Sequence, residues 1–316
     1  MWERVPADAI VFTDENVARH WPVAAQQTVV LPPGEHTKSV EFFEFCHRKL
    51  AELRATRKTP LVAFGGGVIG DLVGFVAATY MRGVPYIQVP TTLLAQVDSS
   101  VGGKVAIDLP EGKNLVGAFY TPREVLVSTE YLSTLDPREY DNGMAEVWKY
   151  GAIMDAEFFE MLEPGAMAQD ALVRRCVKLK AKVVEADEFE TTGLRAILNF
   201  GHTIGHAIEK VENYAGHKHG EAIAMGMVAE AKLGEALGMT PPGTSQKIEQ
   251  ALSGQRLPTR IPRNHSADAL LQAMAIDKKA GPDGLAFSLL TRLGACKLVQ
   301  NVDEASVREV LETCWA

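Results

Sequence analysis

The sequence predicts two domains: an α/β domain with a parallel sheet over residues 1–128, and an all-α domain over residues 129–316. In the first part, short apolar runs alternate with helical patterns, which is typical of a parallel sheet with helices on its faces. After about Ser128 the strand patterns nearly vanish and long helical patterns dominate. We therefore expect the domain boundary near Thr129.

Apolar runs predict the strands of the first domain. They cover residues 9–12, 28–31, 61–64, 86–89 and 124–127. Between the second and third runs, Phe43, Cys46, Leu50 and Leu53 follow the period of a helix, which predicts a helix over residues 40–53.

A glycine-rich turn follows the third apolar run. Gly65-x-Gly67-x-x-Gly70 lies between that run and a helix-compatible stretch, which is the strand–turn–helix context of a dinucleotide-binding turn. There the pyrophosphate rests on backbone N–H groups at the start of the helix. The acid expected about 20 residues later is absent, because Thr91-Thr92 follows the next strand. The turn predicts a Rossmann-like nucleotide-binding domain with a non-standard binding mode; the alternative is a turn that only packs helix on strand.

Helical patterns predict the second domain. They cover residues 137–154, 169–187, 199–213, 219–237 and 266–276. Only residues 285–290 resemble a strand. A nucleotide-binding domain followed by a helical domain has a natural active site in the cleft between them.

Composition and charge favour a globular cytoplasmic enzyme. The 316 residues are 47% hydrophobic and carry a net charge of −8 with no basic run, which argues against nucleic acid as a partner. No apolar run approaches the roughly 20 residues of a membrane span, and the first residues do not resemble a signal peptide. The four cysteines are scattered without C-x-x-C spacing, as in proteins that keep reduced thiols.

Histidines give the clearest chemical pattern of the second domain. His202 and His206 are four residues apart, so a helix places both imidazoles on one face. His219 opens another helical run, and Glu146 lies in a third. Two or three imidazoles with one carboxylate are the ligands of a catalytic Zn²⁺ with an open position. For His202 and His206 alone, a hydrogen-bonded pair without metal is the alternative.

Basic residues lie in stretches where a ligand could be bound. Lys104 and Lys113 flank an apolar strand in glycine-rich contexts that allow close backbone approach. Lys180 and Arg195 precede the histidine motif, and Asp277-Lys278-Lys279 lies further along the chain. Cations gathered around a metal predict a phosphorylated or carboxylated substrate.

Several long motifs occur in one order over most of residues 9–300. They are Gly65-Gly-Gly-Val-Ile-Gly-Asp71, Tyr80-Met-Arg82-Gly83, residues 89–104 (VPTTLLAQVDSSVGGK), Gly112-Lys-Asn114, residues 143–151 (GMAEVWKYG), residues 194–206 (LRAILNFGHTIGH) and His219-Gly-Glu221. In these motifs the chain resembles the 3-dehydroquinate synthase family, a group of sugar-phosphate cyclases. It departs from the family pattern in lacking an opening strand and in a stretch at residues 188–193 that is one residue longer.

The resemblance implies a role for each candidate residue. Glu146, His202 and His219 would hold Zn²⁺ or Co²⁺, whereas His206 would lie near the substrate phosphate and His217 would be a bystander. The substrate phosphate would be held by Lys104, Asn114, one of Lys278 and Lys279, and Arg82 from the partner subunit of a homodimer. The rest of the substrate would meet Lys180, Arg195, Asn199, Lys149 and Asp98. NAD would be contacted by Asp14, Asn16, Glu35, Lys38, Gly66, Gly67, Val68, Gly70, Asp71, Thr91, Thr92, Lys104 and Lys113.

The implied reaction converts 3-deoxy-D-arabino-heptulosonate 7-phosphate to 3-dehydroquinate and phosphate, in the shikimate pathway to chorismate and the aromatic amino acids. The C5 proton becomes acidic only when C4 is a ketone, so Zn²⁺ would polarise the C4 hydroxyl and NAD⁺ would oxidise it. Phosphate would leave, NADH would return its hydride, and ring opening with an intramolecular aldol step would close the carbocycle. NAD⁺ would therefore show no net consumption.

Three alternatives stay open. Another sugar-phosphate cyclase would use the same mechanism on a different sugar, although Arg195, Asn199 and His206 argue against it. A metal-dependent polyol dehydrogenase of related fold would consume NAD⁺ in proportion to product and would not need the lysines. A binding protein without catalysis would not need a complete set of metal ligands.

Overall fold

The structure, a computed structural model, describes residues 2–23, 27–162, 166–276 and 285–316. Contacts between residues divide the chain into two compact units, Met1–Tyr140 with Val173–Ala181, and Asp141–Leu172 with Lys182–Ala316. The middle of helix α6 (Gln169–Ala186) thus belongs to the first unit. The predicted domain boundary near Thr129 stays a prediction.

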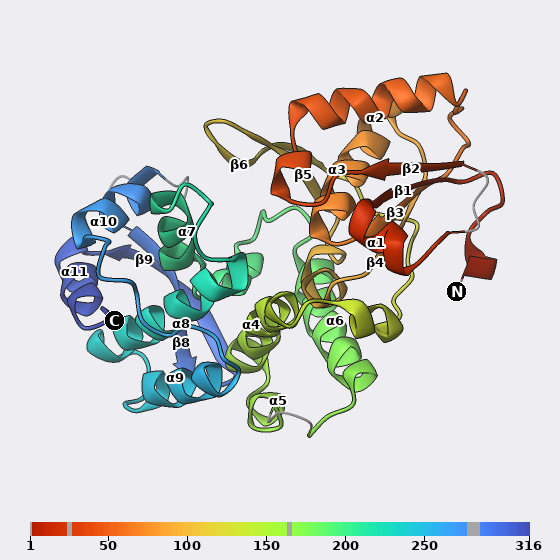
Figure 1. Cartoon of the computed structure of the whole chain (residues 1–316). Coiled ribbons are helices and arrows are strands. Elements are labelled where there is room, and N and C mark those ends of the chain that lie inside the picture. Colours follow the sequence, from red (N-terminus) through yellow and green to blue (C-terminus); the bar gives the residue numbers. More distant parts are fainter. Residues whose placement is uncertain (1, 24–26, 163–165, 277–284) are drawn as a thin grey trace. The chain divides into compact units, whose positions relative to one another are not determined.

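A parallel sheet with strand order β2-β1-β3-β4-β7 forms the centre of the first unit, which confirms the predicted α/β fold (Figure 1). The strands are β1 (Ile10–Asp14), β2 (Gln27–Leu31), β3 (Leu61–Gly65), β4 (Tyr86–Pro90) and β7 (Glu124–Val125). All of their pairings are parallel. Strand β2 lies on one side of β1 and β3 on the other, so the strand order reverses between β1 and β3. Parallel sheets bind ligands at the carboxyl ends of strands at such a switch point.

Both faces of the sheet are covered by apolar packing. The helices of this unit are α1 (Glu15–His20), α2 (Val40–Glu52) and α3 (Gly67–Thr79). Ile10 and Phe12 of β1 pack in one core with residues of α2 and α3. Val11 of β1 and Phe64 of β3 point to the other face and pack with Tyr131. Because strand side chains alternate between faces, burial of both faces explains why the strands read as continuous apolar runs.

An antiparallel hairpin of β5 (Lys104–Leu109) and β6 (Gly112–Phe119) forms a separate two-stranded sheet. The sequence analysis predicted β5 but not β6. Val105 and Ile107 of β5 join the core beside α3, whereas β6 is partly or fully exposed along its length. A strand with no buried face lacks the apolar alternation by which strands are predicted.

The second unit is mostly helical, as predicted, and also contains a hairpin. Its helical segments are α4 (Pro137–Met154), α5 (Ala156–Glu160), the ends of α6, the 3₁₀ segment η6 (Leu194–Asn199), α7 (His202–Val211), α8 (His219–Ala236), α9 (Thr244–Gly254), α10 (Ala267–Ile276) and α11 (Glu304–Glu312). Strands β8 (Leu285–Arg292) and β9 (Ala295–Val302) pair antiparallel, and β8 packs on α7, α8, α10 and α11. The hairpin thus adds two strands that the all-α prediction did not include, and half of the residues of its second strand are exposed. Within the described ranges, no helix is both long and apolar enough to cross a membrane.

Helices α7 and α8 approach each other closely at glycines. A Cβ on Gly226 of α8 would lie 2.0 Å from the carbonyl oxygen of Gly201, the residue that precedes α7. A Cβ on Gly205 of α7 would lie 2.7 Å from an isoleucine side chain of α8. Since His202 and His219 are the first residues of these two helices, the glycine contacts set the distance between them.

Candidate active site

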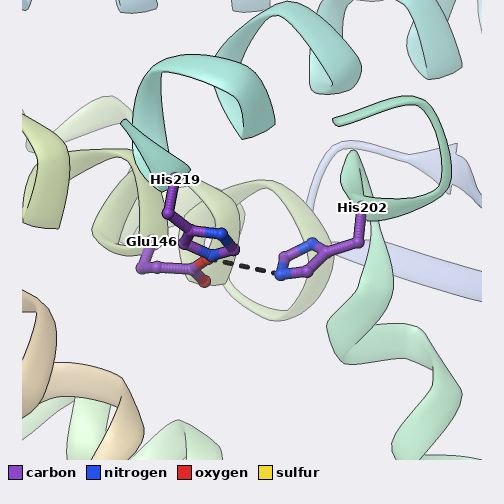
Figure 2. Close-up of side chains that lie close together, drawn as sticks. All are labelled: Glu146, His202 and His219. Atoms are coloured by element: carbon purple, nitrogen blue, oxygen red, sulfur yellow. Dashed lines mark hydrogen bonds and ion pairs between the residues drawn. The ribbon is translucent and has the colours of Figure 1, made fainter. Parts of the chain in front are cut away.

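Glu146, His202 and His219 come together in the second unit from three different helices (Figure 2). Glu146 lies within α4, and the histidines begin α7 and α8. Oε1 of Glu146 is 3.4 Å from Nε2 of His202 and 3.3 Å from Nε2 of His219. The potential ligand atoms of the three residues all lie within 4.8 Å of one another. The structure thus brings together the three residues that the resemblance assigned to a metal.

The spacing of these donors fits a tetrahedral metal site. Ligands bound about 2.0–2.1 Å from a tetrahedral Zn²⁺ are about 3.4 Å from one another. The distances from Glu146 Oε1 to the two imidazoles are 3.4 and 3.3 Å. Oε2 of Glu146 is buried without a hydrogen bond among the described residues, although Lys149 Nζ forms an ion pair with it. Two imidazoles and a carboxylate suit Zn²⁺ or Co²⁺, so the residues present fit the expected metal.

Buried hydrogen bonds fix the helices that carry these ligands. Asn142 lies one turn before Glu146 on α4, and its Oδ1 accepts the backbone N–H of Gly220 (2.6 Å), which ties the start of α8 to α4. Glu230 of α8 accepts the N–H of Gly201 (2.6 Å) and a second N–H in the first turn of α7 (3.2 Å). A carboxylate there satisfies free N–H groups and lies at the positive end of the helix dipole. The sequence analysis missed Asn142 and Glu230, because neither belongs to a local motif with the histidines.

Burial and the neighbouring polar groups shift the pKa values of all three residues. Burial disfavours the ionised form of Glu146, but the charge of Lys149 and contacts with both histidines outweigh it and hold the pKa of Glu146 well below its usual value. Burial and the charge of Lys149 lower the pKa of His202 to about 3. Burial would also lower the pKa of His219, yet hydrogen bonds to Glu146 and Glu209 raise it to about 10. At neutral pH Glu146 is therefore ionised and His202 neutral, the forms that a metal ligand needs, whereas His219 is held protonated between two carboxylates.

His206 lies beside this group rather than in it. Its side chain is 42% exposed, and its Nε2 is 4.0 Å from Oε2 of Glu209. Glu209 is buried and lies 3.5 Å from Nδ1 of His219, so His206, Glu209 and His219 form a second possible ligand group. His217 pairs with Glu212 instead (2.7 Å). The sequence analysis missed Glu209; its spacing of seven residues from His202, on the same helix face, is the signal that could have revealed it.

Arg195 and Asn199 belong to η6, just before α7. The Arg195 side chain is buried, and its Nη1 donates to the carbonyl of Glu188 (2.7 Å). The carboxylate of Asp187 accepts three backbone N–H groups of this loop, those of Thr191 (2.8 Å), Thr192 (3.0 Å) and Arg195 (3.1 Å). These hydrogen bonds lower the pKa of Asp187 to about 2, and the one from the N–H of Thr192 has the largest effect on it. Asp187 therefore fixes the loop that contains the extra residue, and with it Arg195.

Other predicted substrate residues belong to the first unit. Lys180 donates to the backbone carbonyl of Asp98 (2.7 Å) and lies 2.9 Å from its carboxylate. Lys104 begins β5, and Asn114 of β6 has a left-handed φ of 57°. Arg82 also has a left-handed φ, of 66°. The two remaining candidates, Lys278 and Lys279, lie outside the described residues.

The predicted glycine turn lies at the switch point of the sheet. The carbonyl of Gly65 accepts the N–H of Thr91 (3.0 Å), and a Cβ on Gly66 would lie 3.0 Å from Cγ2 of Thr92. The turn and the two threonines, at the ends of β3 and β4, are thus neighbours. Helix α3 starts directly after this turn, with the candidates Gly67, Val68, Gly70 and Asp71 in its first residues. The free backbone N–H groups at the start of a helix are suited to bind a pyrophosphate.

Charged residues surround the same edge of the sheet. The buried Lys38 lies 2.8 Å from Asp71 and 3.9 Å from Glu35, and Lys113 lies 3.8 Å from Glu35. Burial alone would lower the pKa of Lys38, but the charge of Asp71 outweighs it and raises this pKa. At the end of β1, Asp14 caps α1 by accepting the N–H of Asn16 (2.9 Å). These residues are therefore grouped around the ends of β1 and β3, as a nucleotide site would require.

Comparisons with known proteins give one consistent result. A family model described as 3-dehydroquinate synthase N-terminal matches residues 28–142, and one described as 3-dehydroquinate synthase C-terminal matches residues 143–280. A 3-dehydroquinate synthase of Xylella fastidiosa (strain 9a5c) is 44% identical over 330 residues, covering 96% of this chain and 83% of the relative. A 3-dehydroquinate synthase of Geobacter metallireducens is 46% identical over 294 residues, covering 90% and 80%.

A solved structure of the same fold is a 2-deoxy-scyllo-inosose synthase complexed with carbaglucose-6-phosphate, NAD⁺ and Co²⁺. It is 30% identical to this chain with a TM-score of 0.86, and the match covers 99% of this chain and 93% of that one. The family models, the curated relatives and this structure agree with the resemblance found in the motifs. The chain therefore belongs to the 3-dehydroquinate synthase family.

Proposed function

We propose that the chain converts 3-deoxy-D-arabino-heptulosonate 7-phosphate to 3-dehydroquinate and phosphate, with NAD⁺ and Zn²⁺ or Co²⁺ as cofactors. The observation that carries this proposal is the group of Glu146, His202 and His219, in a chain 44% identical over 96% of its length to a 3-dehydroquinate synthase. The related inosose synthase was solved with NAD⁺ and Co²⁺, which supports the same pair of cofactors.

The residues of the chain bind and orient the substrate in this proposal. When bound, the metal supplies Lewis acidity at a substrate hydroxyl and NAD⁺ supplies a hydride acceptor. Arg195, which is buried and fixed by its loop, and Asn199 in the same 3₁₀ segment would anchor the carboxylate end and ring hydroxyls. Guanidinium offers a planar pair of donors that matches a carboxylate. Lys104 and Asn114 on the β5–β6 hairpin would hold the phosphate.

A phosphate-release assay tests the reaction. With the heptulosonate phosphate as substrate, phosphate and dehydroquinate should appear in equal amounts and require NAD⁺, while absorbance at 340 nm stays constant. Steady growth of NADH absorbance with product would move the chain to the polyol dehydrogenases. Turnover of a different sugar phosphate, with none of the heptulosonate, would indicate another sugar-phosphate cyclase.

Histidine variants test the proposed metal ligands. His202→Ala removes one of three ligands, so it should lose bound metal and activity together. His206→Ala should lose activity but keep stoichiometric metal, because its imidazole lies outside the Glu146 group. His20→Ala, on exposed surface in α1, is the matched control and should behave as the wild type. Metal retained in His202→Ala but lost in His206→Ala would overturn the assignment.

We further propose that the chain forms a homodimer in which Arg82 reaches the substrate phosphate of the partner. Met81 beside Arg82 is 43% exposed, and β6 exposes Leu115 (47%) and Phe119 (46%). Exposed apolar side chains on one unit favour contact with another molecule. The left-handed backbone of Arg82 also supports a special role, because residues other than glycine rarely adopt it.

Mixing two inactive variants tests this arrangement. Arg82→Ala should fold, dimerise and bind zinc but bind substrate weakly, and His202→Ala should be inactive. In a mixed dimer the Arg82→Ala subunit keeps its metal ligands and receives an intact Arg82 from its partner. Random exchange of equal amounts should therefore restore up to about a quarter of wild-type activity, since half of the dimers are mixed and each has one intact site. No recovery, with mixed dimers shown to form, would contradict sharing.

We also propose that the enzyme works in the cytoplasm. The cysteines are all free in the structure, three of them buried, which supports a reducing compartment. Activity found only in a membrane or extracellular fraction of the source cells would argue against this location.

A further inference from the structure

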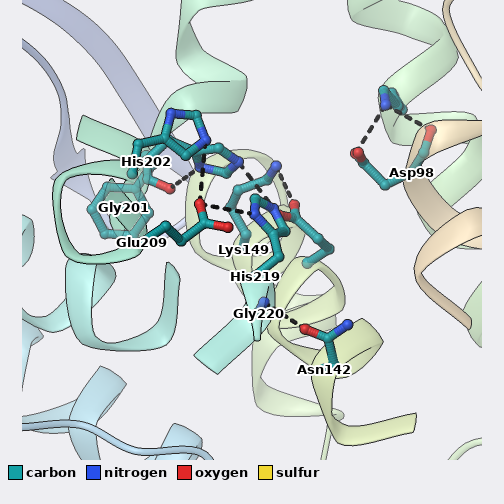
Figure 3. Close-up of polar contacts among 12 residues, drawn as sticks. Asp98, Asn142, Lys149, Gly201, His202, Glu209, His219 and Gly220 are labelled. Atoms are coloured by element: carbon teal, nitrogen blue, oxygen red, sulfur yellow. Dashed lines mark hydrogen bonds and ion pairs between the residues drawn. The ribbon is translucent and has the colours of Figure 1, made fainter. Parts of the chain in front are cut away.

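Glu209 is a buried carboxylate that faces the candidate metal group from the side opposite Glu146. It lies on α7, seven residues after His202 and three after His206, so all three side chains share one helix face. Its Oε2 is 3.5 Å from Nδ1 of His219 (Figure 3). The same oxygen is 4.0 Å from Nε2 of His206. Only 4% of Glu209 is exposed, and carboxylates are rarely buried without a partner.

The imidazole of His219 therefore lies between two carboxylates. Its Nε2 is 3.3 Å from Oε1 of Glu146, and its Nδ1 is 3.5 Å from Oε2 of Glu209. A metal ligand must present a nitrogen lone pair, and a histidine does so with one nitrogen while the other carries the proton. In proteins, that second nitrogen usually donates to a carboxylate or carbonyl, which fixes the tautomer and the ring plane.

We propose that Glu209 is a positioning residue of the metal site: it accepts the Nδ1 proton of His219 and so directs Nε2 toward the metal. This inference rests on the metal-binding role proposed above for Glu146, His202 and His219. His206 lies at the edge of the same carboxylate, so Glu209 also links the metal ligand to a histidine expected beside the substrate.

The rival interpretation is that Glu209 itself binds a metal with His206 and His219. The distances favour the positioning role. The carboxylate of Glu146 lies 3.3 and 3.4 Å from its two imidazoles, close to the distance between two ligands of a tetrahedral zinc. The carboxylate of Glu209 lies 3.5 and 4.0 Å from its two imidazoles. Both groups need the imidazole of His219, through opposite nitrogens.

Zinc titration of the metal-free full-length protein, in competition with a chromogenic chelator, tests the proposal without relying on activity. The wild type should bind one zinc per chain, and Glu209→Ala should still bind one with a Kd raised about 10- to 100-fold. Glu209→Gln keeps an acceptor for the Nδ1 proton and should fall between the two. Glu309→Ala, on the exposed face of α11, is the matched control and should keep the wild-type Kd.

The tautomer gives a second readout that a purely structural role would not change. In zinc-loaded protein labelled with ¹⁵N-histidine, His219 should carry its proton on Nδ1 in the wild type, and that proton should exchange faster in Glu209→Ala.

The outcomes separate this inference from the proposed function. A Kd and proton exchange unchanged in Glu209→Ala, while His202→Ala loses zinc, would overturn the positioning role alone. Two zinc ions per wild-type chain and one in Glu209→Ala would overturn the positioning role and show that Glu209 is itself a metal ligand. Absence of stoichiometric zinc in the wild type would remove the proposed metal site, and the inference with it.

Discussion

The replacement Gly226→Ala should separate the two helices that carry His202 and His219. Gly226 lies on α8, where the new Cβ would be 2.0 Å from the carbonyl oxygen of Gly201 and 2.9 Å from the backbone nitrogen of Gly205. Both atoms belong to backbone, so neither can turn away as a flexible side chain could. Because a Cβ essentially never approaches another heavy atom within 3.0 Å, α7 and α8 must move apart by at least 1.0 Å.

Two effects should follow from that displacement. Overpacking typically costs about 1–3 kcal/mol, and a clash with backbone atoms belongs at the upper end of this range. The better helix propensity of alanine offsets about 1 kcal/mol, so we expect a net loss of about 2 kcal/mol. Metal sites tolerate changes of only about 0.2 Å in ligand distances. Moving His202 away from His219 by several times that amount should weaken zinc binding roughly tenfold or more. At a fixed zinc concentration above Kd, a tenfold loss adds about 1.4 kcal/mol to the destabilisation.

Urea unfolding of the metal-free and zinc-saturated protein measures both effects. Gly226→Ala should lose about 2 kcal/mol without metal and more with it. Gly254→Ala is the matched control: this glycine ends α9, and a Cβ added there would meet no described atom within 4 Å, so alanine should be neutral or slightly stabilising. If Gly226→Ala keeps the wild-type unfolding free energy within about 0.5 kcal/mol and also the wild-type zinc Kd, the packing argument is wrong.

Three further predictions address other groups of the second unit. Lys149→Met removes the ammonium paired with the buried Glu146 carboxylate and leaves His219 as its cationic neighbour, so the metal-free protein should lose at most about 3–5 kcal/mol of unfolding free energy and the zinc-loaded protein less; equal losses in both forms would refute this account. Asp187→Ala frees the loop that holds Arg195, so kcat/KM should fall by up to about 100-fold while zinc and NAD⁺ affinities are kept, and an unchanged kcat/KM would exclude this role. Burial raises the pKa of Glu212, but hydrogen bonds from His217 and His265 outweigh it and leave the pKa below 4.5. Its stabilisation is therefore present above about pH 4.5 and is lost as the pH falls through the folded pKa, so the stability difference between wild type and Glu212→Gln should shrink as the pH falls below about 4.5; a difference that grows on acidification would contradict the sign.

Several parts of the structure could be predicted because local sequence determines them. Continuous apolar runs mark β1, β3 and β4, which are buried on both faces, and the edge strand β2 also lies where an apolar run predicted it. The 3.6-residue period of apolar side chains predicts the first and last residues of α4 and α8 almost correctly. The glycine turn after β3 follows from the need for close backbone approach at the start of a helix. By contrast, β6 has no buried residue and β9 has one, and neither strand has apolar periodicity, so their pairing depends on the partner strand.

The composition of the candidate metal site was also determined by sequence, as histidines and a carboxylate in helical runs. The residue pattern left open which imidazoles join Glu146, because the four-residue spacing of His202 and His206 suggests that they act as a pair, and only the family resemblance selected His202 and His219. The tertiary structure supplies the physical reason for that selection: His202 and His219 start two helices in glycine contact, whereas His206 lies one turn further along α7. Glu209, Glu230 and Asn142 became functional candidates for the same reason. A side chain's partner across two helices is set by how the helices pack, and a single sequence does not contain that distance.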